Sequence, residues 1–243
     1  MTIQAKERPI LFSGPMVRAI VEGRKTVTRR LLKVWQQPSL QKDGTWFATA
    51  QRHQRWGFGV SGADAASCAA ELVSSGVCPY GRRGDRLWVR EAWAQINVAQ
   101  APGESWVVYR ECDNRTDYGG PWKPSIHMRR RDSRILLEVT DVRIERLQDI
   151  SDNQAQAEGM VFTDFGMQER PGKVSLDGGK SFHPMKPQQA PGWHAGNATQ
   201  PDQCLDRARW AFANLWEKIN GEYSWDANPW VWVVEFKRID PCA

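Results

Sequence analysis

The stretch Gly23-Arg24-Lys25-Thr26-Val27-Thr28-Arg29-Arg30 places a lysine, two threonines and three arginines within eight residues. A lysine close to a hydroxyl group is the simplest arrangement that can activate an oxygen nucleophile. The same residues also suit a solvated basic strand that only binds phosphate groups. The composition of the stretch therefore leaves both interpretations open, and the rest of the chain must separate them.

The residues before this stretch predict a short helix. Ser13 is a favoured N-cap residue, and apolar side chains recur with helical spacing as far as Val21. Gly23 then ends the helix as a C′ glycine, and residues 24–32 lead into a strand. In a regular strand Lys25 and Thr28 point to opposite faces, so they can cooperate only if the backbone turns between them. Lysine acts as a base only when its pKa falls, and the neighbouring arginines would lower that pKa.

The composition predicts a folded intracellular protein. The chain has 243 residues, 41% of them hydrophobic, with 13 Trp and a net charge of +5, so it is long enough to bury a core. The positive charge suits an anionic partner. The five Cys and four His lack the spacing of metal ligands, so we expect no metal and no cofactor. Without a secretory signal or a membrane-spanning run, we expect a cytoplasmic protein with no membrane contact; the sequence leaves the oligomeric state open.

The remaining patterns favour an α+β fold with few helices. Strands are predicted at residues 86–91, 106–110, 135–144 and 230–236, the last apolar on both faces and hence central. A capping box opens a short helix that reaches Glu158, and a longer helix ends at residue 220. We expect a small mixed β-barrel forming a single domain over residues 9–239, with insertions at about 35–80 and 163–202. The second insertion lacks periodicity and reads as a mobile loop, a lid or disorder.

Four further residues are candidates for chemistry or binding. A carboxylate at Glu158 would meet the negative end of its helix dipole, a poor choice for stability that suits a general acid or base. Glu91 follows a predicted strand and either points into a barrel mouth or forms an ion pair with a nearby arginine. His127 begins a basic run that ends at residue 131, and Arg30 offers a cation for an oxyanion or a phosphate.

These pieces, in this order, resemble the ASCH domain family, whose fold is a PUA-like β-barrel. The family pattern Gly-x-Lys-x-x-(Glu or Thr)-x-Arg is matched at Gly23, Lys25, Thr28 and Arg30. The sequence as a whole is most similar to the larger ASCH proteins of phages and prophages. Small relatives in the family are bacterial N4-acetylcytidine amidohydrolases, and the resemblance places their Lys, Thr and Glu active-site residues on Lys25, Thr28 and Glu158. It covers less than half of the chain, and the small hydrolases lack both insertions.

Three functions follow as expectations. The first is hydrolysis of an acyl group from a modified nucleobase, with Thr28 as nucleophile or water-positioning group, Lys25 as base and Glu158 as acid. Arg30, Glu91 and His127 would then contact a modified nucleoside or RNA. The alternative is a PUA-like module that binds RNA or another nucleic acid, or cuts RNA as a ribonuclease. The third is a phage accessory protein that binds a host factor through the insertions.

Overall fold

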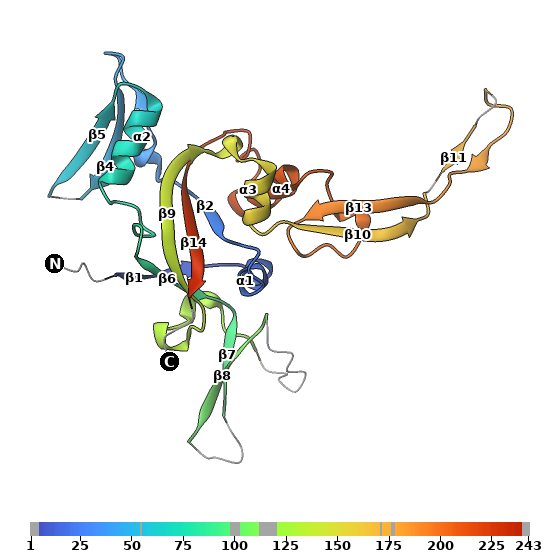
Figure 1. Cartoon of the computed structure of the whole chain (residues 1–243), viewed down its shortest axis with the longest axis horizontal. Helices are drawn as coiled ribbons and strands as arrows, with labels where there is room; N and C mark the ends of the chain where they lie inside the picture. The colour runs from blue at the N-terminus through green and yellow to red at the C-terminus, as the bar shows by residue number, and fades with distance from the viewer. Residues whose placement is uncertain are drawn as a thin grey trace.

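A central five-stranded sheet organises the molecule, for which a computed structural model describes residues 5–53, 55–97, 103–111, 121–170, 172–175 and 178–239. The strand order is β1-β6-β9-β14-β2, with β1 and β6 parallel and the other pairs antiparallel. Figure 1 shows these strands at the centre of the molecule, with the other elements projecting from them. The strands are β1 (Glu7–Leu11), β6 (Arg86–Arg90), β9 (Leu136–Arg146), β14 (Trp230–Ile239) and β2 (Val27–Leu31).

Strand β14 is central, as its sequence predicted. It lies between β9 and β2, and Val231, Trp232, Val233 and Val234 are all fully buried. Alternate side chains enter two different cores: Trp232 and Val234 pack on one face of the sheet, Val231 and Val233 on the other. Because both faces are covered, the strand carries no polar stripe along this segment.

Four α-helices of the described residues cover the two faces. Helix α1 (Gly14–Val21) and helix α2 (Ala65–Ser74) bury side chains in the first core. Helix α3 (Asp152–Ala157) and helix α4 (Ala208–Asn220) contribute to the second. The predicted helices before Gly23 and before Glu158 are therefore present, which brings the ends of α1 and α3 to the sheet.

The mixed α+β class is confirmed, but the described strands form several sheets and no closed barrel. The two edges of the central sheet nevertheless approach each other. The Arg30 guanidinium on β2 donates to the Leu11 carbonyl on β1, with Nη2 and O 2.6 Å apart. Within the described residues β1 and β2 share no backbone ladder. A side chain thus bridges the edges where a closed barrel would have backbone hydrogen bonds.

Residues 34–74 form a small unit on the same core. It contains η1 (Val34–Gln36), β3 (Ser39–Leu40), β4 (Trp46–Arg52), β5 (Gly57–Gly62) and α2. The strands form an antiparallel sheet in the order β3-β4-β5. Their inner side chains, Ala48, Ala50 and Val60, join the core beneath α2 that the central sheet also uses.

The expectation of a mobile loop or disorder at 163–202 is wrong for most of that tract. Strands β10 (Val161–Gln168) and β13 (Gln188–His194) pair as an antiparallel ribbon, and β11 (Lys173–Val174) pairs with β12 (His183–Pro184) farther out. Figure 1 shows this ribbon extending well away from the body. Cross-strand contacts, such as the Phe162 and Trp193 rings 5.3 Å apart, hold it together. The tract is rich in Gly and Pro and shows no two-residue alternation of apolar side chains, so its strands were not predicted. The backbone hydrogen bonds that pair these strands do not require such an alternation.

A second hairpin and four single turns complete the described structure. The hairpin joins β7 (Trp93–Asn97) to β8 (Ser105–Tyr109), and the turns are η2 (Ser125–His127), η3 (Arg130–Asp132), η4 (Leu147–Asp149) and η5 (Pro201–Gln203). In the part of the chain that is described, no helix combines the length and the apolar character needed to cross a membrane.

Candidate functional site

Lys25 lies in a turn before β2 and not within the strand. Gly23 ends α1 with a φ of 76°, which glycine adopts without strain. The backbone N–H groups of Arg24 and Lys25 then both donate to the Ala19 carbonyl, at 2.9 and 3.0 Å. Strand β2 begins only at Val27. The strict alternation that would separate Lys25 from Thr28 therefore does not apply, and the turn carries the lysine into the interior.

The Lys25 ammonium forms a buried ion pair with Glu158. Its Nζ lies 2.6 Å from Glu158 Oε2, and the side chains are 0% and 2% exposed. Nζ also lies 2.8 Å from the backbone carbonyl oxygens of Val27 and of Glu158 itself. Three acceptors match the three protons of an ammonium group, so this geometry is that of the charged lysine.

The pKa of Lys25 is lowered from its ordinary value. Burial has the largest influence, because it removes the charged form from water. The charge and hydrogen bond of Glu158 act in the opposite direction, while the Arg30 and Arg29 cations lower the pKa further. A lysine that gives up its proton more readily than in water is suited to proton transfer.

Helix α3 places Glu158 at this position. A reciprocal capping box between Ser151 and Gln154 starts the helix, and Glu158 is its C-cap residue. Gly159 follows with a φ of 101°, and a Cβ there would stand 3.1 Å from the Ala19 Cβ. Glycine thus allows the close approach of α3 to α1. As predicted from sequence, the carboxylate lies at the negative end of the helix, where neighbouring cations must offset the dipole.

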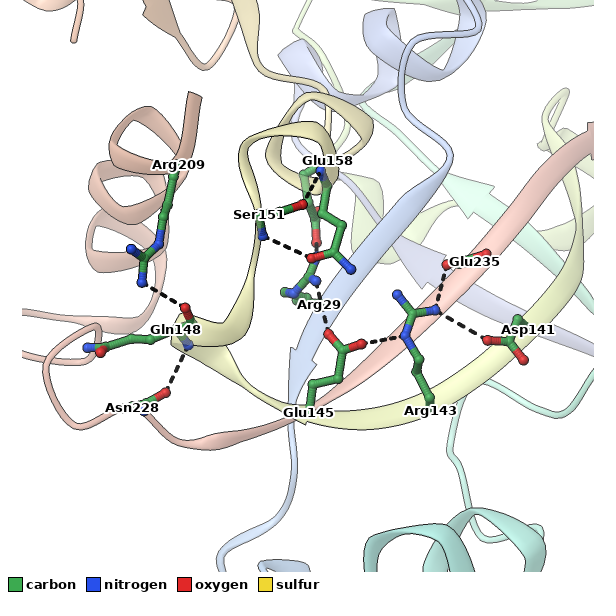
Figure 2. A network of polar contacts seen from close by, with 11 residues as sticks. Arg29, Asp141, Arg143, Glu145, Gln148, Ser151, Glu158, Arg209, Asn228 and Glu235 are labelled. Atoms are coloured by element: carbon green, nitrogen blue, oxygen red, sulfur yellow. Dashed lines mark hydrogen bonds and ion pairs between the residues drawn. The ribbon is translucent and has the colours of Figure 1, made fainter. Parts of the chain in front are cut away.

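A chain of alternating charges extends from this pair across the sheet (Figure 2). Arg29, whose side chain is fully buried, reaches Glu158 Oε1 at 3.5 Å and Glu145 Oε2 at 3.1 Å. Glu145 contacts Arg143 at 2.5 Å, and Arg143 in turn contacts Glu235 at 2.5 Å. The chain runs from the buried site towards progressively more exposed carboxylates.

The sequence analysis did not predict this row of ion pairs, because it treated Arg29 only as a cation near Lys25. A signal was present in β9, where Asp141, Arg143 and Glu145 alternate and so share one face of a strand. A strand face bearing three charges of alternating sign indicates an ion-pair row. Its connection to Arg29 needed the strand order, which the sequence does not supply.

A pocket of about 360 Å³ opens beside the ion pair. Three of the predicted site residues line it, namely Thr28, Arg30 and Glu158. Apolar side chains from the end of β1 and the residue after it, from β2, from α1 and from α4 form most of the remaining wall: Leu11, Phe12, Met16, Leu31, Phe212, Leu215, Trp216 and Ile219. An apolar cavity with a few convergent polar groups is the usual form of a small-molecule site.

The predicted catalytic triad is brought together in part. Glu158 contacts Lys25 and shares the pocket wall with Thr28. Lys25 lies behind Glu158 and does not line the pocket. Within the described residues, no hydrogen bond joins the Thr28 hydroxyl to the Lys25 amine. Glu158 is therefore the group that connects the buried lysine with the cavity.

Glu91 and His127 do not line this pocket. Glu91 is 1% exposed and binds the Arg134 guanidinium through both oxygens, each at 2.9 Å. This is the ion pair that sequence reasoning gave as one of its two interpretations. His127 is exposed at the end of η2, and its neighbour Ser125 lines the pocket instead. Arg30 does line the pocket, with its guanidinium 5.3 Å from the Phe12 ring centre.

No group of three or more His, Cys, Asp or Glu side chains within the described ranges could hold a metal ion. Comparisons of the chain with protein-family models, with curated proteins and with solved structures gave no match.

Proposed function

We propose that the protein is a hydrolase that removes an acyl group from the exocyclic nitrogen of a modified cytosine-type base. The observation that carries the proposal is the buried Lys25–Glu158 pair, whose carboxylate lines an apolar pocket that Thr28 also lines. The resemblance of residues 23–30 to the ASCH pattern supports it. We propose with it a PUA-like core, supported by the approach of the β1 and β2 edges at Leu11 and Arg30.

A contribution to stability does not by itself explain why Lys25 and Glu158 form a buried ion pair. Removing two charges from water costs several kcal/mol for each ion, and apolar side chains of similar volume are often as stable. Glu158 also opposes the α3 dipole, which adds a few tenths of a kcal/mol to about 1 kcal/mol. Perturbed ionisable groups of this kind cluster at functional sites.

The proposed chemistry divides into proton transfer and attack on the acyl carbon. The Thr28 oxygen attacks the carbonyl carbon while its proton passes to the Glu158 carboxylate, which lines the same pocket. The tetrahedral intermediate collapses by breaking the carbon–nitrogen bond, and the proton goes to the leaving amine. Water then hydrolyses the acyl-threonine to the free acid and regenerates the hydroxyl group. Alternatively, Glu158 takes a proton from water that Thr28 positions, and the same bond breaks in one attack.

Lys25 acts through Glu158 in either route. As an ammonium it donates a hydrogen bond to the carboxylate and holds it in one orientation. Its lowered pKa allows it to share the proton that Glu158 receives. The base of the substrate would pack against Trp216 and Phe12, which line the pocket.

Turnover of N4-acetylcytidine tests the proposal, with release of cytidine and acetate as the readout. We expect Glu158→Gln and Lys25→Met to lower kcat/KM by about 10²-fold or more, the usual contribution of acid–base groups. Rapid quenching of wild type and of Thr28→Val separates the two routes. An acyl-enzyme that forms in wild type and is absent from Thr28→Val indicates that Thr28 is the nucleophile. Glu91→Gln is the matched control, since it neutralises an equally buried carboxylate that does not line the pocket. Absence of turnover of any N4-acylated cytidine by the wild-type protein would overturn the proposal.

The alternative of a nucleic-acid-binding module without catalysis is favoured by the unpaired cations near the pocket described below. It predicts that Lys25→Met and Glu158→Gln leave affinity for RNA within a few-fold of wild type, apart from losses in stability. A ribonuclease would instead shorten labelled single-stranded RNA, and the same two variants would abolish that cleavage.

A further inference from the structure

Two arginines without a carboxylate partner lie beside the pocket residue Leu11. Arg30 donates to the Leu11 carbonyl from one side. Arg90 is the register partner of Leu11 in the parallel β1–β6 pair. Among the described residues neither guanidinium forms an ion pair. Both sit against aromatic rings, Arg30 at 5.3 Å from Phe12 and Arg90 at 4.6 Å from Trp88.

Stacking of this kind leaves the N–H groups of a guanidinium available to an anion. Each of these two side chains also has a buried Nε without a hydrogen-bond partner in the described structure. The pocket edge is thus built with cations whose hydrogen-bonding capacity the protein uses only in part.

More cations continue from Arg90 along the β1–β6 edge. The surrounding segments carry Lys6, Arg8, Arg82, Arg83, Arg86, Arg90, Arg129, Arg130 and Arg131. Contacts bring three of them together: the Arg86 N–H donates to the Lys6 carbonyl at 2.8 Å, and Glu7 contacts both Arg130, at 2.5 Å, and Arg86, at 3.8 Å.

The carboxylates within these segments are already engaged. Asp85 is buried and accepts hydrogen bonds from the backbone N–H groups of Lys6 and Arg82. Glu7 is shared by Arg86 and Arg130, and the hydrogen bond from Arg130 lowers the pKa of this carboxyl. A net positive surface therefore extends from the pocket edge along β1 and β6. We name it the β1–β6 basic edge, defined by the nine cations given above.

We propose that the base entering the pocket belongs to a single-stranded nucleic acid whose phosphates lie on the β1–β6 basic edge; this inference rests on the proposed function. A free nucleoside carries no phosphate and would leave these cations without a role. The five paired residues of β1 and β6 span about 13–16 Å at the usual rise of a strand, which is long enough to contact several successive phosphates. The strand must be single, because a base inside the pocket cannot remain paired and stacked.

The geometry assigns different tasks to the two ends of this surface. Arg30 and Arg90, next to the pocket, would contact the phosphates of the nucleotide being processed. Arg82 and Arg83 are exposed at the turn before β6, at the opposite end, and would contact phosphates farther along the strand. Replacing Arg82 and Arg83 should therefore weaken binding of the polymer and leave turnover of the free nucleoside unchanged.

The experiment measures binding and turnover separately. Fluorescence anisotropy would follow a labelled single strand of about ten nucleotides, as RNA and as DNA, over a range of salt concentrations. The test variant is Arg82→Gln with Arg83→Gln. The control is Lys42→Gln with Arg55→Gln, which makes the same change in charge at exposed positions of the β3–β5 sheet region. Turnover would be measured on free N4-acetylcytidine and on the same base within the oligonucleotide.

We expect wild-type protein and the control to bind the strand equally. The test variant should bind about tenfold more weakly at low salt, with a salt slope reduced by about 0.7 for each lost phosphate contact. Its kcat/KM should fall for the oligonucleotide and stay unchanged for the nucleoside. The RNA and DNA arms show whether the 2′-hydroxyl contributes to recognition.

Several outcomes overturn the inference while leaving the hydrolase intact. They are turnover of the nucleoside without binding of any strand, equal losses in the test and control variants, or equal affinity for heparin and the strand. Binding that depends on Arg82 and Arg83 without any turnover would support the basic edge and reject the hydrolase. The two proposals can thus fail independently.

Discussion

Replacing Glu158 by Gln is the sharpest test of the buried ion pair. The change removes the carboxylate charge and keeps the shape of the side chain. Lys25 would then lie in the interior at 0% exposure with two carbonyl groups and one amide as its neighbours. Removing one partner of a buried pair typically costs 3–5 kcal/mol, because the remaining charge is uncompensated. The amide oxygen still accepts a hydrogen bond, so we expect about 3 kcal/mol, the lower end of that range.

The free energy of unfolding that Glu158→Gln loses should become smaller as the pH rises. The folded-state pKa of Lys25 is already lowered, and the charge and hydrogen bond of Glu158 oppose that shift. Without them the pKa falls further. Between the folded and unfolded pKa values the unfolded chain binds more protons, so the free energy of unfolding increases with pH over that window. In the variant this window opens at a lower pH, which means that the deficit against wild type is largest near neutral pH and decreases in alkali.

Urea unfolding from about pH 7 to about pH 10 measures both effects. With a denaturant slope of roughly 3 kcal/mol per M, the expected loss lowers the midpoint by about 1 M near pH 7. Glu91→Gln is the control, since it removes an equally buried carboxylate from its ion pair with Arg134. An arginine keeps its proton throughout this range, so that loss should not vary with pH. A pH-independent deficit for Glu158→Gln, or one below about 1 kcal/mol, would refute the reasoning.

Three smaller perturbations test the elements that position the site. Gly159→Ala should cost about 2 kcal/mol, because its φ is 101° and the added Cβ meets α1 at 3.1 Å; Gly76→Ala, with a φ of 70° and open space, should cost about 1 kcal/mol in the same unfolding assay. Ser151→Ala removes the capping box of α3 and should cost about 1 kcal/mol, and Ser151→Asp should restore most of it. Burial lowers the pKa of His194, so stability falls as acid protonates the unfolded histidine first. The two backbone amides that donate to its Nδ1 should lose protection against hydrogen exchange, relative to the intrinsic rate at each pH, below about pH 6.

Local chemistry predicted the elements that frame the site. A C′ glycine at position 23 and a capping box at Ser151 have short-range causes, and both occur as expected. Glu158 stood out because a carboxylate at a helix C-terminus conflicts with the dipole, and the structure places it in a buried ion pair. The apolar run of β14 correctly indicated a strand covered on both faces.

The remaining features depend on which strands become neighbours. Arg29 on β2 and Arg143 on β9 both pair with Val233 of β14, one from each side. Only this order brings Glu145 within 3.1 Å of Arg29. The ribbon of β10 and β13 was missed for a different reason: backbone hydrogen bonds hold it together, and those do not depend on the side-chain pattern from which strands are predicted.

The order of charges explains why Glu158, and not Lys25, faces the cavity. A buried lysine can be held by one carboxylate, but here Arg29 contacts the second oxygen of the same carboxylate. Glu158 is thus fixed by two cations, one of which has a lowered pKa and one of which stays charged. Arg29 is in turn offset by Glu145, so the excess positive charge does not remain in the interior. A carboxylate held in this way can take up a proton and return it without moving, because its partners are already in place. We propose that Glu158 transfers the proton to whatever occupies the pocket, while Lys25 and Arg29 hold its two carboxylate oxygens in place.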